Sequence, residues 1–357
     1  MSKLGLLVTN LEQELQYFKD IAIAGSKEGM DIYLFSPTDI DLNQKVVKGK
    51  KFCPTSNRWV NNCFSIPLFI YDRCFYENEV VYKKHFPYVS WLKSQADVVF
   101  LGHGLPNKWF VYNLLKEDHI IHSFLPKTEL LIDDEQVFTM FENDHSVLLK
   151  PMSGSQGKGI FVLAKEERSF SLLAKKENQH FYKKVTEKQV KHLLYKISKR
   201  YKYLLQPFLS LTNDEQRPFD LRVFLQKDER GQWGEIGRGI RAGKVGDFTS
   251  NLASGGKIVP YQKWLRSLSR KDQVVLQKNI NELLERIPKV LENHYPLFEL
   301  GLDFGFDQTG KLWLLEVNSK PGRKVITTSF PDKEKLLAKA PIHYCLFLQL
   351  KKGVEFT

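Results

Sequence analysis

The feature that most constrains this chain is a pair of strand-like segments near its C-terminal end, residues 300–307 and 312–318, which are separated by a short turn. A two-residue loop at positions 309–310 would join them as a β-hairpin and would fix which residues lie opposite one another. In that register Asp303 lies directly opposite Glu316. The sequence therefore predicts a hairpin that brings two carboxylates side by side.

The predicted hairpin has a polar face and an apolar face. On the polar face Gly301 lies opposite Asn318, beside the two carboxylates. Two like charges about 5 Å apart repel by about 3 kcal/mol at an effective dielectric constant of about 20, so a cation is expected there. Mg²⁺ commonly binds through one or two carboxylates together with substrate phosphates, and the predicted ligands are Asp303, Glu316 and Asn318. The alternative is a solvent-exposed hairpin with incidental acids. The apolar face, suited to a core, has the pairs Leu302–Val317, Phe304–Leu315 and Phe306–Trp313.

A glycine-rich loop at residues 153–159 follows Lys150 and lies between two predicted strands. Glycines allow backbone N–H groups to approach phosphate oxygens closely, and lysines add positive charge. The loop lacks the spacing of a Walker A motif, and a strand follows it instead of a helix. A nucleophile elbow would need glycine at position 153, and the Ser155-x-x-Lys158 match to penicillin-binding enzymes lacks its partner motifs. An ordinary hairpin tip is the alternative to a phosphate cradle made by Lys150, Ser153, Gly154, Ser155, Gly157, Lys158 and Gly159.

Three further polar elements precede the hairpin. Arg222 opens a predicted strand, Arg241 lies on the next one, and Asn251 begins a glycine-containing segment. Singly, each is typical of a protein surface. If they converge on one triphosphate, they would stabilise the charge that develops on a transferring phosphoryl group. We therefore treat Arg222, Arg241 and Asn251 as candidate catalytic residues.

Composition excludes several classes of protein. A chain of 357 residues with 42% hydrophobic residues is globular and is expected to contain more than one lobe. No apolar run approaches the ~20 residues needed to span a bilayer, so a soluble, cytoplasmic protein without a membrane partner is expected. Four cysteines form no metal-binding or disulfide pattern. Of the net charge of +12, residues 165–202 hold twelve Lys or Arg against four Glu. A helix with a Thr186-x-x-Gln189 capping box would expose these lysines to solvent.

The order of predicted elements indicates three lobes. Residues 4–8, 11–27 and 31–35 predict a β-α-β start, and strands at 66–71 and 98–101 extend it to an open α/β sheet. We expect an N-terminal α/β domain at 1–124, a central lobe with the glycine-rich loop at 125–202, and a C-terminal lobe with the hairpin at 203–357. A long helix is predicted after a second cap at Ser269, with a kink at Pro288.

Taken in order, these residues resemble an ATP-grasp protein over about 124–330. The motif set is Lys150, the loop 153–159, the segment 206–209, Arg222, Arg241, Asn251, Asp303 and Glu316-x-Asn318. The whole chain is similar to the YheC/YheD group of spore-coat-associated ATP-grasp proteins. That closer resemblance rests on Tyr71-Asp-Arg73, Lys108-Trp109, 125–128 and 220–224.

The resemblance implies an ATP-grasp fold preceded by a pre-ATP-grasp α/β domain, with ATP and Mg²⁺ as cofactors. Lys150 and Lys158 would hold the phosphates, and Arg222, Arg241 and Asn251 would steady the γ-phosphate. Asp303, Glu316 and Asn318 would bind Mg²⁺. The adenine would lie at the hinge formed by Gln206, Pro207, Phe208 and Leu209, where Gln206 departs from the acidic residue that is common in the family.

The implied reaction is carboxylate–amine ligation through an acyl phosphate, with small-molecule or peptide substrates. Lys320, Arg323 and Lys324 would receive a carboxylate, or form a plain basic loop. Two other functions stay open: an ATP-binding spore-coat assembly protein with little turnover, and a polyanion binder that uses residues 165–202. Nucleic acid is not the expected partner. Salt-dependent nucleic-acid binding that survives Lys158→Ala and Glu316→Ala would favour the polyanion binder.

Overall fold

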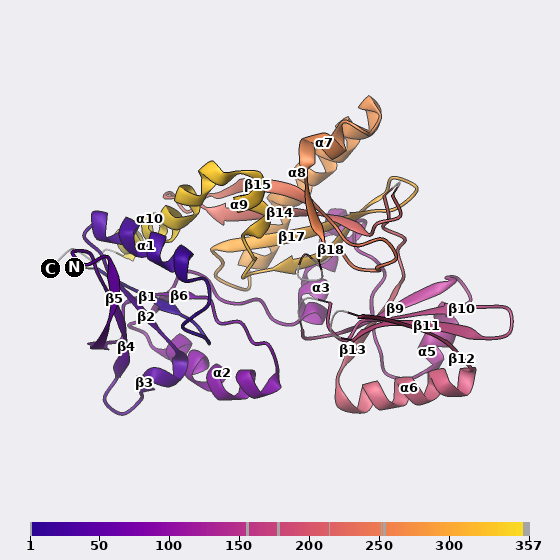
Figure 1. The fold of residues 1–357 in the computed structure, drawn as a ribbon, viewed down its shortest axis with the longest axis horizontal. Helices are drawn as coiled ribbons and strands as arrows, with labels where there is room; N and C mark the ends of the chain where they lie inside the picture. Colours follow the sequence, from indigo (N-terminus) through magenta and orange to yellow (C-terminus); the bar gives the residue numbers. More distant parts are fainter. Residues whose placement is uncertain are drawn as a thin grey trace.

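The computed structural model describes residues 2–154, 157–176, 179–213, 215–250, 252 and 255–352. Within these residues the strands form three separate sheets. Figure 1 shows the three sheets as three lobes, with the third sheet lying above the other two. The predicted site residues come from the second and third sheets, so the facing of these two lobes positions the site.

The first sheet confirms the predicted β-α-β start. Its central strands β2, β1, β6 and β7 are parallel, and the β4–β5 hairpin and short β3 extend one edge. Helix α1 covers one face and α2 the other, each packed on its own apolar cluster. The hairpin and β3 were not predicted. The elements are β1 (Lys3–Leu7), α1 (Leu15–Lys27), β2 (Asp31–Phe35), η1 (Pro37–Asp39), β3 (Ile40–Asp41), β4 (Val46–Cys53), β5 (Arg58–Ser65), β6 (Phe69–Asp72), α2 (Glu79–Ser94) and β7 (Val99–Phe100).

The second sheet is antiparallel and has the strand order β12-β11-β10-β9-β13-β8. Helices α5 and α6 cover one face through a shared apolar cluster. Figure 1 shows α6 on the side away from the third sheet. The predicted capping box is confirmed, because Thr186 Oγ1 accepts a hydrogen bond from the Gln189 amide. The elements are β8 (Glu129–Leu130), α5 (Glu135–Met140), β9 (Ser146–Pro151), β10 (Phe161–Lys165), β11 (Phe170–Lys176), β12 (Gln179–Val185), α6 (Glu187–Arg200) and β13 (Tyr203–Pro207).

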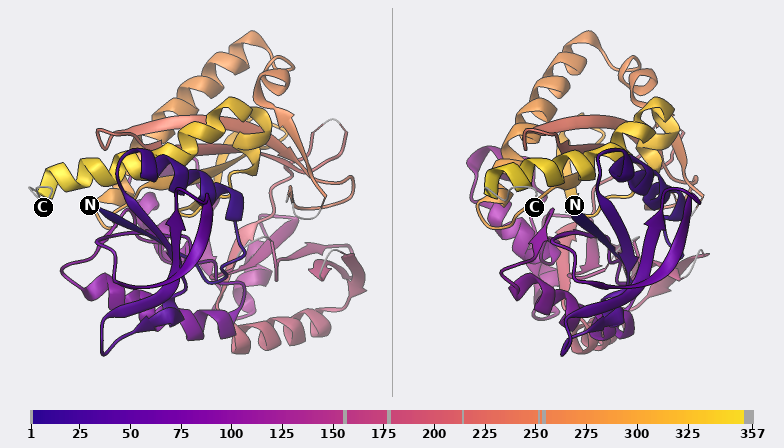
Figure 2. Two further views of the ribbon diagram at one scale, coloured as in Figure 1. Left: turned by 60° about the vertical axis from the view of Figure 1, so that its left-hand side comes forward. Right: turned by 90° about the vertical axis from the view of Figure 1, so that its left-hand side faces the viewer.

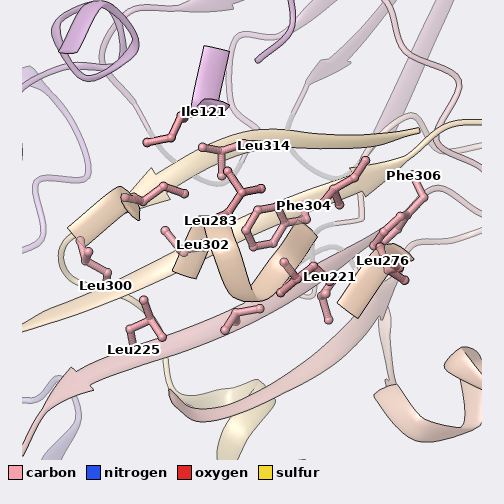
Figure 3. Packing of buried hydrophobic residues seen from close by; sticks show 14 of the residues in the cluster. Ile121, Leu221, Leu225, Leu276, Leu283, Leu300, Leu302, Phe304, Phe306 and Leu314 are labelled. Carbon is pink, nitrogen blue, oxygen red and sulfur yellow. The ribbon is translucent and has the colours of Figure 1, made fainter. Parts of the chain in front are cut away.

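The third sheet is antiparallel, in the order β16-β15-β14-β17-β18. One face of the sheet packs against α3, α4, α7 and α8. Figure 3 shows leucine and phenylalanine side chains of the apolar cluster between this face and the helices. Helix α8 begins after the predicted cap, where Ser269 Oγ accepts the Asp272 amide at 3.2 Å, and it continues through Pro288. The elements are α3 (Lys108–Lys116), α4 (His119–His122), β14 (Phe219–Lys227), β15 (Trp233–Ala242), β16 (Lys257–Pro260), α7 (Tyr261–Leu265), α8 (Arg270–Glu292), β17 (Glu299–Phe306) and β18 (Leu312–Asn318).

The polar end of the β17–β18 hairpin has the predicted register. Asp303 lies opposite Glu316, and Gly301 lies opposite Asn318. Toward the turn the prediction was wrong, since Phe304 lies opposite Leu314 and Phe306 opposite Leu312.

Two irregularities explain this mixed outcome. The Asp307 amide donates to the Lys311 carbonyl, so the loop has one residue more than expected, with Gly310 at a φ of 80°. A β-bulge between Asp303 and Phe304 on the pairing path inserts one extra residue, Leu315, on β18. The two shifts cancel at the polar end.

The last helices return to the N-terminal domain. Helix α9 (Lys324–Ser329) packs on the third sheet, η3 (Pro331–Lys333) follows, and α10 (Glu334–Lys352) lies against α1. Figure 2 shows α10 running beside α1. β13, although it follows residue 202, pairs within the second sheet. The domain limits at 124 and 202 stay predictions. Among the described helices, none combines the length and apolarity that crossing a membrane requires.

Candidate functional site

Lys108 joins the glycine-rich loop to the β17–β18 hairpin. It is the first residue of α3, which Asn107 caps by accepting the amides of the next turn. Its backbone amide donates to the Met152 carbonyl, and its Nζ donates to the Gly154 carbonyl at 2.5 Å. The same Nζ lies 3.4 Å from Glu316 Oε1. One lysine thus holds a phosphate-loop candidate and a metal-ligand candidate together.

Lys150 lies in the same electrostatic neighbourhood. It is on β9, opposite Leu204. Burial lowers the pKa of Lys150 to about 8, the Glu316 carboxylate opposes this shift, and the Lys108 ammonium adds to it. Two lysines and one carboxylate therefore meet between the second and third sheets. A partly buried lysine with a lowered pKa is stabilised by a neighbouring anion, such as a phosphate group.

The glycine-rich loop adopts backbone conformations that favour glycine. Gly157 and Gly159 have φ values of 72° and 75°, and Tyr203 Oη donates to the Gly159 carbonyl at 3.2 Å. Ser153 and Lys158 are exposed at the loop surface, as is Gly154. Ser155 lies outside the described residues. The described part of the loop thus has glycines in the left-handed region and an exposed lysine, Lys158, next to them.

Asp303 is held between the two predicted arginines. Arg222 lies opposite it on β14 and grips both carboxylate oxygens, with Nη2 at 2.8 Å from Oδ2. Arg241 Nη2 contacts the same Oδ2 at 2.9 Å. Burial alone would raise the pKa of Asp303, but the two guanidinium groups outweigh it and hold the pKa below its ordinary value. The three side chains form one buried ionic unit.

Asp220 extends this unit and was not predicted as a site residue. Arg241 Nε and Nη2 lie 2.6 Å from its two carboxylate oxygens, and Ser250 Oγ donates to Oδ2. Burial raises the pKa of Asp220, and the Asp303 charge adds to this shift against the pull of Arg241. Asn251 follows Ser250 in the chain but lies outside the described residues. Two arginines and two carboxylates therefore balance their charges on this face of the sheet.

The donor set for the predicted metal fits Mg²⁺. Glu316 and Asn318 are partly exposed. Asp303 is buried, and its two arginines occupy three of its roughly four lone-pair sites, which leaves about one for a metal ion. Carboxylate and amide oxygens on adjacent positions are the hard ligands that Mg²⁺ takes, together with phosphates and water. Over the described ranges there is no cluster of three or more His, Cys, Asp or Glu suited to a metal. The predicted set has only two acids and one amide, so a metal ion held there would need further ligands, such as phosphate oxygens or water.

Part of the predicted adenine hinge forms hydrogen bonds to other residues of the protein. Gln206 is buried, and its Nε2 donates to Thr128 Oγ1 at 2.5 Å. The Phe208 amide donates to the Ser146 carbonyl. Pro207, Phe208 and Leu209 keep partial exposure. Contacts to a base at this hinge would therefore come from residues 207–209, because the Gln206 side chain is used to fix the strand to residue 128.

The basic residues after β18 are mostly paired. Lys320 Nζ lies 2.6 Å from Asp72 Oδ1, and Arg323 Nη2 lies 2.5 Å from Glu14 Oε1. Lys324 is exposed. Lys320 and Arg323 thus neutralise acids of the N-terminal domain instead of facing solvent as carboxylate receivers.

Comparison with known proteins identifies the family. A family model described as YheC/D like ATP-grasp matches residues 97–348. The endospore coat-associated protein YheC of Bacillus subtilis strain 168 is 32% identical over 373 aligned residues, which cover 99% of each chain. This chain belongs to the YheC/D-like ATP-grasp family. Membership confirms the resemblance seen in the sequence.

A second curated relative and a solved structure are also similar to this chain. The endospore coat-associated protein YheD of the same organism is 23% identical, covering 94% of this chain and 74% of its own. The structure of D-alanyl-alanine synthetase A from Vibrio cholerae has a TM-score of 0.55 at 13% identity, covering 99% of both chains. The latter confirms the ATP-grasp fold.

Site residues that the sequence reasoning missed are Lys108 and Asp220. Both stood in motifs that carried the resemblance, and neither had been given a role. Lys108 follows an asparagine that caps a helix, a local signal for a fixed helix start. Its proximity to Glu316 depends on tertiary packing and has no local signal.

Proposed function

We propose that this chain is a Mg-ATP-dependent ligase that joins a carboxylate to an amine through an acyl phosphate. The observation that carries the proposal is the convergence of Lys108, Lys150 and the glycine-rich loop on Glu316. The second support is the buried unit of Arg222, Arg241 and Asp303 on the same sheet face. Positive charge for phosphates and oxygen ligands for Mg²⁺ then occupy facing sides of one site.

The proposed residue roles follow from these contacts. Lys150, Lys158 and the loop amides hold the ATP phosphates, and Lys108 keeps the loop close to Glu316. Asp303, Glu316 and Asn318 hold Mg²⁺, which offsets phosphate charge when it is bound. Arg222 and Arg241 are pre-ordered by Asp303 and Asp220, so they lose little freedom on meeting the γ-phosphate. Asn251 completes the set by proposal alone.

The proposed reaction has two steps. A substrate carboxylate oxygen attacks the γ-phosphorus and ADP leaves, which gives an acyl phosphate. An amine then attacks the acyl carbon, the C–N bond forms, phosphate leaves, and the amine loses a proton. Activation is needed because a carboxylate oxygen is a poor leaving group, whereas phosphate is a good one. Small molecules or peptides with these two groups are the proposed substrate class.

A spore-coat role is a second proposal, supported by the names of the relatives YheC and YheD. In that form the chain binds ATP and assembles with coat proteins with little turnover. It would act in the cytoplasm or at the coat surface. The two proposals differ in whether ADP is produced when substrates are supplied.

The test is incubation of the protein with Mg-ATP and pooled amino acids, peptides or cell extract. Ligation predicts ADP release that depends on the added pool, together with a new amide product seen by mass spectrometry. Glu316→Gln serves as the control and should release no ADP above background. Tight ATP binding without pool-stimulated ADP would replace the ligase with the assembly protein.

A further inference from the structure

The segment that follows the predicted metal ligands is fastened to the N-terminal domain. Ser319 Oγ accepts the Leu105 amide at 2.8 Å, directly after Asn318. Lys320 Nζ pairs with Asp72 and donates to the Cys74 carbonyl at 3.2 Å. Successive residues after β18 are therefore tied to elements outside their own sheet.

Arg73 is the centre of this fastening. Its side chain is fully buried. Nη1 lies 2.5 Å from Glu299 Oε1, and Nη2 donates to the Pro321 carbonyl at 3.2 Å. Glu299 is on β17, and Tyr71 Oη donates to its other oxygen at 2.9 Å. The Arg73 guanidinium, directly after β6, thus binds one strand of the β17–β18 hairpin and the loop that follows the other strand.

Glu14 closes the network on its second side. It accepts from Arg73 Nε and Nη2 at 3.1 and 3.0 Å and also pairs with Arg323. The Arg323 guanidinium lies over the Tyr17 ring, 3.3 Å from its centroid. Burial would raise the pKa of Glu14, but the two arginines outweigh it and lower the pKa. Two arginines and two carboxylates therefore balance, which is the condition for keeping such charges inside a protein.

The network reaches the candidate catalytic arginine through Gly301. A Cβ at this position would lie 2.7 Å from Pro321 Cβ and 2.9 Å from Arg222 Nη1. Pro321 and Arg222 thus pack on the same bare stretch of β17, between Glu299 and Asp303. If Pro321 moves toward Gly301, it contacts Arg222 after a short distance, because the packing leaves little free space between them.

We propose that Arg73 is a positioning residue for the β17–β18 hairpin, which carries the proposed metal ligands. Through Glu299 and the Pro321 carbonyl it holds β17 and the exit from β18, so that Glu316 and Asn318 stay opposite Asp303 and Gly301. The N-terminal domain is then part of the metal site although it supplies no ligand. The metal readout of this inference rests on the proposed Mg-ATP function, whereas the structural coupling does not.

The first experiment uses Arg73→Lys, which keeps the charge but cannot hold Glu14, Glu299 and Pro321 together. ADP affinity is measured by calorimetry with Mg²⁺ and with EDTA. The affinity gain that Mg²⁺ provides should fall at least tenfold, while ADP affinity in EDTA changes less than twofold. The matched control is Arg238→Lys, another arginine paired with a carboxylate, Glu235, on β15 of the same sheet. It should leave both affinities unchanged.

The second experiment needs no nucleotide. Hydrogen exchange of the backbone amides in residues 312–323 should be at least fivefold faster in Arg73→Lys and unchanged in Arg238→Lys. If Arg73→Lys does not fold, Glu14→Gln and Tyr71→Phe replace it, with smaller increases expected because each removes fewer contacts. Unchanged exchange and unchanged Mg²⁺ gain in the folded variants would overturn the inference. If the wild type binds no Mg-ADP but hydrogen exchange of residues 312–323 is still faster in Arg73→Lys, the proposed function is overturned and the positioning role of Arg73 stands.

Discussion

Lys108 and Glu316 form an ion pair of 3.4 Å between the start of α3 and the polar end of β18, and the same ammonium holds the Gly154 carbonyl. The pair connects elements of different parts of the fold. A single side chain therefore connects the glycine-rich loop to the β17–β18 hairpin.

Replacing Lys108 by methionine should weaken nucleotide binding. The loop loses its tie at Gly154, and the site loses one positive charge. We expect ADP affinity to fall roughly tenfold, which is about 1.4 kcal/mol, in isothermal calorimetry. Lys127→Met removes an exposed lysine paired with Glu129 and is the matched control. Equal affinity in the two variants would exclude a role for Lys108.

Replacing Lys150 by methionine should raise thermal stability at pH 7 and lower the affinity for ADP. Its folded pKa of about 8 lies below the ordinary value of 10.5, so the unfolded chain binds more protons between these values. Its contribution to the free energy of unfolding therefore rises with pH from about 8 to about 10.5. At pH 7 the buried charge is a cost, and Lys150→Met should raise the Tm while ADP affinity falls at least tenfold. Scanning calorimetry of the wild type and Lys150→Met at pH 7 and pH 10 measures the Tm difference, which should be smaller at pH 10. A lower Tm of the variant at pH 7 would contradict the prediction.

The pH dependence of binding gives a second readout for Lys150. The ammonium binds phosphate and the free amine does not, so wild-type ADP affinity should decline as the pH rises above about 8. Lys150→Met should lack that decline. Titrations from pH 6.5 to pH 9.5 measure it, and identical profiles for both proteins would assign the decline to another group.

Glu316→Gln should abolish the Mg²⁺-dependent part of nucleotide binding without unfolding the protein. The side chain is about one-third exposed, and its ion-pair partner is the Lys108 ammonium. Exposed pairs of this kind contribute about 0–1 kcal/mol, so the Tm should change by no more than a few degrees. Unchanged ADP production or unchanged Mg²⁺ dependence would remove Glu316 from the metal ligands.

Asp303→Asn should behave differently, because Asp303 is buried between Arg222 and Arg241. Removing one partner of a buried ion pair leaves uncompensated charge and costs about 3–5 kcal/mol. We expect a loss of both stability and Mg²⁺-dependent binding. The wild-type pKa of Asp303 is lowered, so its contribution is present above its unfolded pKa and is lost as pH falls through the folded value. Denaturant titrations of both proteins at pH 7 test the size of the loss.

Local signals in the sequence predicted local structure well. The caps at Thr186 and Ser269 mark real helix starts, because a cap depends on three or four adjacent residues. The β4–β5 and β11–β12 hairpins were missed. Three of these four strands, β4, β11 and β12, contain two or more lysines, and β5 and the described part of β12 are largely exposed, so apolar residues do not alternate along them as in a half-buried strand.

The candidate site was predicted in part, and the reason differs from residue to residue. Asp303 and Glu316 share one hairpin, and their pairing matches the prediction because the longer turn and the bulge shift the register in opposite directions. The contact of Lys108 with Glu316 and that of Arg73 with Glu299 join distant segments. Only the packing of whole domains determines such contacts, and a single sequence carries no periodicity that reports them.

The β17–β18 hairpin combines a turn that is one residue longer than the simplest kind with a bulge at Leu315. The bulge compensates for the longer turn, because beyond it Asp303 lies opposite Glu316 and Gly301 opposite Asn318. A hairpin of this kind can therefore accept a longer turn where a bulge in one strand compensates for the extra residue. Deletion of Leu315 should therefore leave Asp303 opposite Glu316 and Phe304 opposite Leu314 in a regular ladder, because Leu315 is the extra residue of the bulge.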